Sequence, residues 1–312
     1  MLYAIRWKVR YMETKQRVCV LLGGDSPERE VSIKSGQAVI AALSSCGYEI
    51  VAVDPFDGRL EDRLKQISPG KVFIALHGGD GENGTIQRLL EKLKIPYTGS
   101  DSKASWKAMH KGLSRAAFIE NNIMVPKGWV FKKGESVCVD WSCAPFVLKP
   151  ACGGSSIGLC FIEKEDSFEK ALHQAFDYSE ELVIEQLIKG KELTVGILNN
   201  KPLPVIEIVP KAGVFDFHSK YTKGMTEYLI PARLTRREEE NAQAIALRCH
   251  EVLGCRNFSR VDMMYSGNGQ WYVLEVNTIP GLTETSLLPK AAAKVGIDFA
   301  RLCTIMVEKA QV

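Results

Sequence analysis

The N-terminal third of the chain alternates between short apolar runs and longer amphipathic segments. Residues 17–24, 48–54 and 71–79 are almost continuously hydrophobic, as strands buried on both faces of a parallel sheet are. Between them, Ser26 and Pro27 predict the N-cap and the first residue of a helix, and the amphipathic segment 84–95 predicts a second helix. This order predicts a parallel, doubly wound sheet, and therefore an α/β fold for this part of the chain.

The pattern changes near residue 100 and becomes richer in antiparallel strands. Residues 102–122 predict a helix, and a further helix is expected at 166–176. The polar segment 211–231 lacks clear periodicity, and a segment of that length inside a compact domain is usually a functional lid. Strands are expected at 129–133, 144–150, 158–163, 181–188, 193–198 and 202–210.

A long helix is expected after this polar segment. Thr235 and Glu238 have the spacing of a capping box, in which each side chain accepts the backbone N–H of the other residue. Its apolar stripe consists of Ala242, Ile245, Ala246, Cys249 and Leu253.

A β-hairpin with an unusual polar face is expected between residues 260 and 281. The Asn-Gly pair at 268–269 predicts a two-residue type I′ turn. That turn would place Asp262 opposite Glu275 and Arg260 opposite Asn277, all on one face of the hairpin. A loop shifted by one residue would move the pairing and keep the alternation of each strand. The opposite face would carry Val261, Met263, Leu274 and Val276.

Two facing carboxylates in this hairpin need a cation. At a separation of about 5 Å they repel by about 3 kcal/mol at an effective dielectric constant of 20. Arg260 can balance one charge, which would make the pair a structural ion pair. Alternatively, the oxygens of Asp262, Glu275 and Asn277 suit Mg²⁺, which proteins usually hold with one or two carboxylates plus substrate phosphates. The hairpin alone leaves both interpretations open.

A glycine-rich loop joins two strands within residues 146–162, where it can bind phosphate or serve as a plain turn. It lacks the spacing and the helical context of a P-loop. Its glycines would let backbone N–H groups approach phosphate oxygens, and Lys149 precedes them as a point charge. Glu192 is a candidate for contacting ribose hydroxyls, although this segment taken by itself favours a solvated charged turn. The loop residues that could bind phosphate are Gly153, Gly154, Ser155, Ser156 and Gly158.

Composition excludes several functional classes. The chain has 312 residues, of which 46% are hydrophobic and 25% charged, as in ordinary soluble proteins of two or three domains. The net charge is 40 − 37 = +3, and the sequence contains no long basic or acidic block. We therefore expect neither nucleic-acid nor membrane binding. No apolar run approaches the length of a membrane-spanning helix.

Cysteine usage favours a reducing compartment. The nine cysteines are scattered and form no C-x-x-C motif, which argues against a disulfide framework or a zinc site. A cytoplasmic location fits this pattern best. Residues 1–11 are a poor signal peptide, and we expect them to be an extension outside the fold.

Several segments, taken in order, resemble the D-alanine:D-alanine ligase family of the ATP-grasp superfamily. They are LLGGDSPEREVS, ALHGGDGENGTIQ, the VLKP strand with its glycine loop, KYTKGMTEYLIPA, RVDMM and LEVNTIPGLTETSLLP. The resemblance covers residues 17–310 and implies a three-domain ATP-grasp fold of the α/β (α+β) class. The implied divisions are an extension at 1–15, an N-terminal substrate-binding domain at 16–101, a central ATP-grasp domain at 102–188 and a C-terminal ATP-grasp domain at 189–312.

The resemblance implies ATP as substrate and Mg²⁺ as cofactor, and Mn²⁺ is expected to substitute. Two Mg²⁺ ions would be bound by Asp262, Glu275 and Asn277, with Glu275 bridging them. Positions that match ATP contacts in the family are Lys111, Lys149, Ser155, Glu185 to Ile188, Glu192 and Lys220.

The resemblance also implies a site for two D-alanine molecules. Glu28 would lie near the ammonium group of the first D-alanine, with His77 close by. Tyr221 in the lid would be linked by hydrogen bonds to Ser155 and Glu28. The oxyanion donors would be Arg260 and the N–H of Gly281, and the carboxylate of the second D-alanine would bind Ser286 and the N–H of Leu287.

The chain departs from the family in its glycine loop. The family commonly carries a charged pair where this sequence has Cys152 and Gly153. We expect this change to make the loop more mobile and to weaken ATP binding. The lysine and the serine that the family requires are present.

The implied reaction is the ATP-dependent joining of two D-alanines through D-alanyl phosphate, for peptidoglycan synthesis. An ester-forming ligase carries phenylalanine at the lid position, so Tyr221 favours peptide synthesis. A non-catalytic nucleotide-binding regulator is expected to have lost its metal ligands, and all three are present. A kinase would need an H-R-D-type loop, which the sequence lacks. The family further implies a homodimer.

Overall fold

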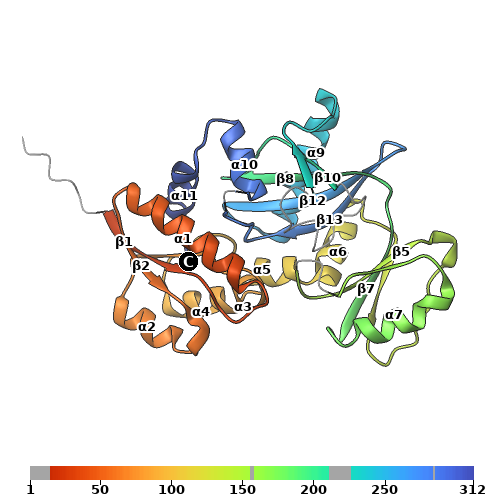
Figure 1. Cartoon of the computed structure of the whole chain (residues 1–312), viewed down its shortest axis with the longest axis horizontal. Coiled ribbons are helices and arrows are strands. Elements are labelled where there is room, and N and C mark those ends of the chain that lie inside the picture. Colours follow the sequence, from red (N-terminus) through yellow and green to blue (C-terminus); the bar gives the residue numbers. More distant parts are fainter. Residues whose placement is uncertain (1–14, 155–157, 211–225, 284) are drawn as a thin grey trace, which may run out of the picture.

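The computed structural model describes residues 15–154, 158–210, 226–283 and 285–312. The predicted extension at 1–11 therefore lies outside the described residues. The described residues form three sheets with helices packed against them (Figure 1). Short 3₁₀ helices cover Pro55–Asp57, Trp141–Cys143 and Glu165–Ser167.

The N-terminal sheet is parallel, with strand order β2-β1-β3, as the apolar runs predict. One face packs against α1 and the C-terminal helices, and the other packs against α2 and α4 (Figure 1). The doubly wound arrangement is thereby confirmed. The elements are β1 (Lys15–Leu21), α1 (Arg29–Ser45), β2 (Tyr48–Val53), α2 (Leu60–Ile67), β3 (Lys71–Ile74), α3 (Gly79–Glu82), α4 (Thr85–Leu93) and α11 (Phe299–Glu308).

Two helices predicted within residues 26–122 differ from those in the structure. The first helix begins at Arg29, because Ser26 forms a turn in which its carbonyl accepts the Arg29 N–H. The Ser26 hydroxyl instead donates to the carbonyl of His77, 2.5 Å away. The helix expected at 102–122 is broken at His110 into α5 (Ser102–Met109) and α6 (Lys111–Glu120).

The central sheet is antiparallel, with strand order β4-β7-β5-β6, and α7 covers one of its faces. Its apolar core is closed by aromatic side chains, among which Phe146 is completely buried. The elements are β4 (Gly128–Lys132), β5 (Phe146–Pro150), β6 (Cys160–Ile162), α7 (Phe168–Ala175) and β7 (Glu181–Gln186).

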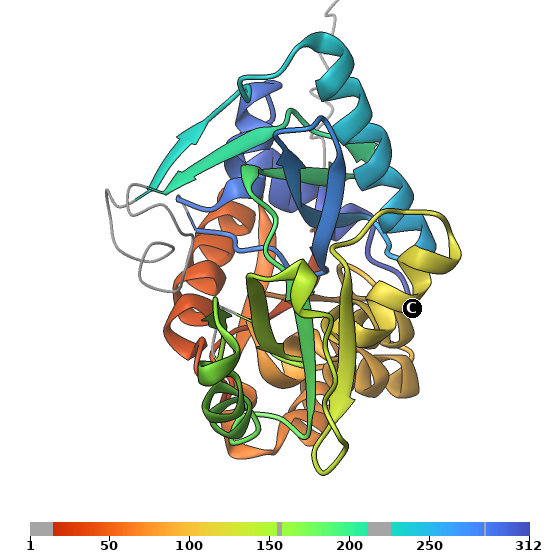
Figure 2. The same ribbon diagram turned by 90° about the vertical axis from the view of Figure 1, so that its right-hand side faces the viewer.

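The third sheet has the order β11-β10-β8-β12-β13, and β9 pairs with β8. Figure 2 shows it beside the central sheet. Helix α9 packs on one face, and the predicted capping box of Thr235 and Glu238 is confirmed. Helix α10 packs on the other face. The elements are β8 (Gly190–Leu198), β9 (Lys201–Pro202), β10 (Ile206–Pro210), β11 (Thr226–Leu229), α9 (Arg236–Leu253), β12 (Phe258–Ser266), β13 (Trp271–Asn277) and α10 (Leu287–Lys294).

The polar hairpin β12–β13 has the predicted pairing at its polar end but a different loop. The loop has three residues, 267–269, since the Ser266 N–H donates to the Gln270 carbonyl and Gly269 has φ of +81°. The extra loop residue is offset by a bulge at Leu274. The pairs Arg260–Asn277 and Asp262–Glu275 are thus confirmed.

The same bulge makes one predicted orientation wrong. Leu274 lines the pocket described below, and Val273 takes its place in the core with Val261, Met263 and Val276. Within the segment predicted to be a lid, 211–231, strand β11 pairs with β10. Residues 211–225 lie outside the described part of the chain. Among the described residues, no helix has both the length and the apolar character needed to cross a membrane.

Candidate active site

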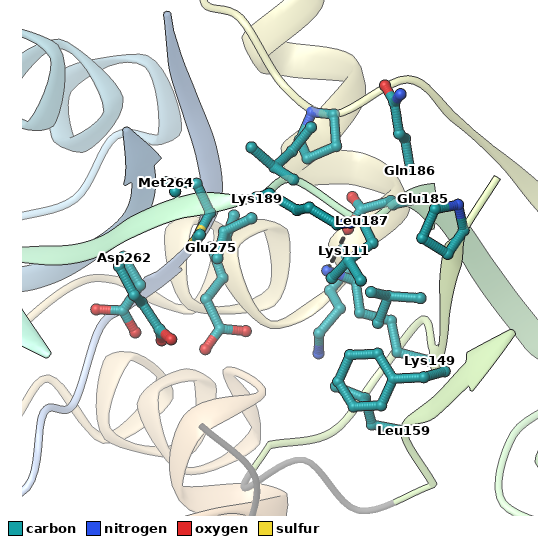
Figure 3. A pocket seen from close by; sticks show the side chains of 18 of the residues that line it. Lys111, Lys149, Leu159, Glu185, Gln186, Leu187, Lys189, Asp262, Met264 and Glu275 are labelled. Carbon is teal, nitrogen blue, oxygen red and sulfur yellow. Dashed lines mark ion pairs between the residues drawn. The ribbon is translucent and has the colours of Figure 1, made fainter. Parts of the chain in front are cut away.

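A pocket of about 540 Å³ lies between the central and third sheets. Figure 3 shows Lys111, Lys149 and Glu185 on one side, with Asp262 and Glu275 on the other. Among the other lining residues are apolar side chains such as Val147, Phe161 and Met264, which suit a flat aromatic group such as a nucleobase. The predicted residues that the structure brings together here are Lys111, Lys149, Gly153, Gly154, Glu185, Ile188, Glu192, Asp262 and Glu275.

Glu185 holds two cations at the floor of this pocket. Its Oε2 lies 2.5 Å from Lys149 Nζ, and its Oε1 lies 3.1 Å from Arg115 Nη1. All three side chains are nearly buried. Burial lowers the pKa of Arg115, and the Glu185 charge opposes that shift. One carboxylate between two cations leaves an excess positive charge facing the pocket, which suits a phosphate.

Lys111 lies under the glycine loop. Its Nζ donates to the carbonyl of Gly153 at 2.5 Å. Burial lowers the pKa of Lys111, the charge of Glu275 opposes this change, and the charge of Lys149 adds to it. The two lysines therefore approach the pocket from different elements, α6 and β5.

Asp262 is the centre of a hydrogen-bond network on β12. Arg260 donates to both of its oxygens, from Nε at 2.9 Å and from Nη2 at 2.7 Å. The Asn277 amide donates at 3.1 Å and the Thr194 hydroxyl at 2.6 Å. Burial lowers the pKa of Arg260, but the charge and hydrogen bond of Asp262, together with Glu275, outweigh it and raise the pKa overall. The ion pair considered from the sequence is therefore present.

The same residues offer an oxygen-rich donor set. Asp262 and Glu275 are cross-strand partners and both line the pocket. With the side-chain oxygen of Asn277 they would supply only oxygen ligands, which fit Mg²⁺ rather than zinc. No group of three or more His, Cys, Asp and Glu residues that could hold a metal occurs in the described part of the chain, and this predicted set has only two carboxylates.

The N-terminal domain reaches the glycine loop through Glu28, just before α1. A Cβ added to Gly78 would lie 2.7 Å from Glu28 Oε2, and one added to Gly154 would lie 3.4 Å from it. His77 follows the end of β3 and is 4% exposed. Its Nε2 lies 2.9 Å from Ser35 Oγ. The two predicted first-substrate residues thus lie at one end of the site.

The loop before α10 is tightly closed around Ser286. The Thr283 N–H donates to Ser286 Oγ at 2.9 Å, and a Cβ added to Gly281 would lie 2.7 Å from the same oxygen. Ser286 is the N-cap of α10, and Leu287 is its first residue. Because a helix N-terminus favours anions, this end can bind a carboxylate.

Four predicted site residues, Ser155, Ser156, Lys220 and Tyr221, lie outside the described residues. In the glycine loop, Gly153 has φ of +121°, a conformation that favours glycine. Burial raises the pKa of the Cys152 thiol.

Sequence reasoning missed Arg115 and Thr194, which hold Glu185 and Asp262 respectively. A charged residue within the apolar stripe of α6 was the available signal for Arg115.

Comparisons with known proteins agree with this geometry. Residues 110–308 match the model for the D-ala D-ala ligase C-terminus, and residues 56–100 match that for its N-terminus. The D-alanine--D-alanine ligase of Syntrophotalea carbinolica is 45% identical, over 92% of this chain and 94% of that protein. The ligase of Aquifex aeolicus is 42% identical, over 93% of this chain and 99% of that protein.

A solved structure extends the likeness to three dimensions. The D-alanine--D-alanine ligase of Bacillus anthracis, complexed with ATP, superposes with a TM-score of 0.83 at 34% identity. The superposition covers 94% of this chain and 97% of that one. The chain therefore belongs to the D-alanine--D-alanine ligase family and has its ATP-grasp fold.

Proposed function

We propose that this chain uses ATP to join two D-alanine molecules into D-alanyl-D-alanine, the dipeptide that enters peptidoglycan. Relatives of nearly the full length are named for this activity. The observation that carries the proposal is the pocket between the two sheets, with Lys111 and Lys149 at one side and facing carboxylates at the other. The Bacillus anthracis ligase that this chain resembles was solved with ATP.

The first step activates a poor electrophile. The carboxylate of the first D-alanine attacks the γ-phosphorus of ATP, and the bond to the bridging oxygen breaks, which gives D-alanyl phosphate and ADP. Lys149 of β5 and Lys111 of α6 would bind the phosphates. Glu28 would hold the ammonium group of the first substrate by charge. Glu192 and the segment from Glu185 to Ile188 would hold the nucleoside.

Asp262, Glu275 and Asn277 would hold Mg²⁺ at the phosphate end, with Glu275 shared between two ions. When bound, Mg²⁺ neutralises phosphate charge and so favours phosphoryl transfer. The hydrogen bonds from Arg260 and Thr194 orient Asp262 for this role, as partners of metal ligands generally do.

The second step forms the peptide bond. The free amine of the second D-alanine attacks the acyl carbon, the bond to the phosphate oxygen breaks, and inorganic phosphate leaves. Arg260 and the N–H of Gly281 would stabilise the tetrahedral oxyanion, where one donor contributes about 10²–10³ in rate. Ser286 and the N–H of Leu287 would bind the second carboxylate at the start of α10.

The amine must lose a proton before it attacks. We assign Tyr221, which would act together with Ser155 and Glu28, to that proton relay, and Lys220 to the phosphates. Closure of the lid segment over the site would keep water from hydrolysing the acyl phosphate. A homodimer in the cytoplasm, with Mn²⁺ able to replace Mg²⁺, completes the proposal.

The experiment that tests the function compares three substrates. Purified protein with Mg-ATP is given D-alanine alone, L-alanine alone, or D-lactate mixed with limiting D-alanine. The released ADP and the condensed products are measured in each case. We expect ADP release and dipeptide with D-alanine, and neither with L-alanine. Equal rates with both enantiomers would exclude the substrate assignment. Nucleotide binding without turnover would favour a regulator.

A further inference from the structure

The short helix α3 holds one carboxylate at the first-substrate end of the site. Gly81 packs so closely on the end of β3 that an added Cβ would lie 2.5 Å from Leu76 Cβ. This contact fixes the helix against the sheet and directs Glu82 inward, where 14% of its side chain is exposed. Glu82 has no role in the mechanism above.

Both ring nitrogens of His77 face a partner. Glu82 Oε1 lies 3.4 Å from Nδ1, and Ser35 Oγ lies 2.9 Å from Nε2. Ser35 comes from α1 and is completely buried. The backbone of His77 is also fixed, because its carbonyl accepts the Ser26 hydroxyl. The imidazole is therefore held from two helices, α1 and α3, and the His77 backbone from the turn at Ser26.

The direction of the Ser35 hydrogen bonds determines where the ring proton lies. The backbone N–H of Leu282, which can only donate, points at Ser35 Oγ at 3.4 Å. Within the part of the chain that the structure describes, the Ser35 hydroxyl has one acceptor, His77 Nε2. A buried hydroxyl that lacked this acceptor would be unfavourable. Nε2 is therefore unprotonated, and the proton lies on Nδ1, facing Glu82.

The Glu82 carboxylate also borders the reacting groups. It lines a small cavity of about 20 Å³ together with Lys111, Gly154 and Glu275. Its charge is among those that raise the pKa of Arg260. Glu82 thus lies between the first-substrate end of the site and the groups to which we assign metal binding and oxyanion stabilisation.

We propose that Glu82 and Ser35 are positioning residues for His77, which they hold as the Nδ1–H tautomer beside the first-substrate site. This role rests on the proposed function. Neither residue touches substrate; both act through the imidazole. Gly78, the next residue after His77, approaches Glu28. A displaced His77 would therefore disturb the binding of the first D-alanine and leave ATP binding unchanged.

The tautomer can be measured without any substrate. Long-range ¹H–¹⁵N correlation spectra resolve the imidazole nitrogens of the five histidines, and His77 is assigned by the signals lost in His77→Asn. We expect the Nδ1–H tautomer in the wild type, and a mixture of tautomers in Glu82→Ala and Ser35→Ala. An Nε2–H ring, an imidazolium ion, or a tautomer that neither variant changes would overturn the proposal even for an active ligase.

Kinetics provide the second readout, because the D-alanine dependence separates the KM values of the two substrate sites. Glu82→Ala and Ser35→Ala should raise the first KM at least about tenfold and change the KM for ATP less than about twofold. Glu82→Gln, which keeps an acceptor for Nδ1–H, should restore the first KM to within about threefold of the wild type.

Matched controls separate positioning from folding. Ser105→Ala removes another buried serine hydroxyl, bonded to the Ser100 carbonyl, and Asp80→Asn changes an exposed carboxylate of α3. Both should keep the wild-type first KM. In a His77→Ala background, the Ser35 and Glu82 changes should have little further effect. A full effect in that background, or equal changes in both substrate and ATP KM values, would overturn the proposal.

Discussion

The buried cluster of Lys149, Glu185 and Arg115 should be among the most sensitive electrostatic features of the protein. Glu185→Gln removes the negative charge that lies 2.5 Å from Lys149 Nζ and 3.1 Å from Arg115 Nη1. At an effective dielectric constant of about 20, these separations correspond to gross attractions of about 7 and about 5 kcal/mol. Desolvation and the mutual repulsion of the cations cancel much of that attraction.

The net cost is set by leaving two buried cations without their carboxylate. Breaking a buried pair in this way typically costs about 3–5 kcal/mol, and the amide of glutamine still accepts a hydrogen bond, so we expect the lower end, about 3 kcal/mol. The measurement is the free energy of unfolding from urea titration, with the ATP KM measured in parallel. Lys149 would lose its fixed position, and the ATP KM should rise.

A surface pair supplies the control. Arg236 and Glu240 form an ion pair on α9 with side chains 92% and 60% exposed. Glu240→Gln should therefore leave the free energy of unfolding nearly unchanged. If Glu185→Gln destabilises the protein no more than Glu240→Gln does, the cluster does not contribute as its geometry indicates.

Three further predictions concern single residues. Glu275→Gln should abolish turnover and keep the melting temperature near that of the wild type; retained activity per folded molecule would mean that the carboxylate is only structural. Tyr221→Phe should lower dipeptide formation near neutral pH and gain D-alanyl-D-lactate formation; unchanged rates of both from about pH 6 to 9 would remove Tyr221 from the proton relay. Burial lowers the pKa of His250 from 6.5 to about 4. The folded state therefore binds fewer protons than the unfolded state between pH 6.5 and pH 4. The free energy of unfolding should be highest above pH 6.5 and should fall by about 3 kcal/mol as the pH falls towards 4. Unfolding titrations of wild type and His250→Asn at several pH values measure this slope, and equal slopes would contradict it.

Features that depend on residues near in sequence were predictable. The alternation in β12 and β13 placed Asp262 opposite Glu275, although the loop between them has three residues rather than two. The bulge at Leu274 offsets that difference, and no local sequence pattern predicted the bulge. The capping box of Thr235 was equally local, since both partners lie within one helical turn.

Features that depend on distant partners were not predictable from one sequence. Glu185 was assigned to ATP contact, but its carboxylate is engaged by Arg115 from α6 and Lys149 from β5. Thr194 reaches Asp262 only because β8 pairs with β12. Such contacts arise from strand pairing and helix packing across the chain, which periodicity within one segment does not encode.

The transfer of oxygen from substrate to phosphate tests the proposed chemistry most directly. D-alanine labelled with ¹⁸O in both carboxylate oxygens is condensed by the protein with Mg-ATP, and the inorganic phosphate is analysed by mass spectrometry. Activation through D-alanyl phosphate predicts that each dipeptide formed releases one phosphate carrying one ¹⁸O, because the substrate oxygen that attacks phosphorus leaves with it. Dipeptide formation with unlabelled phosphate would contradict an acyl phosphate intermediate.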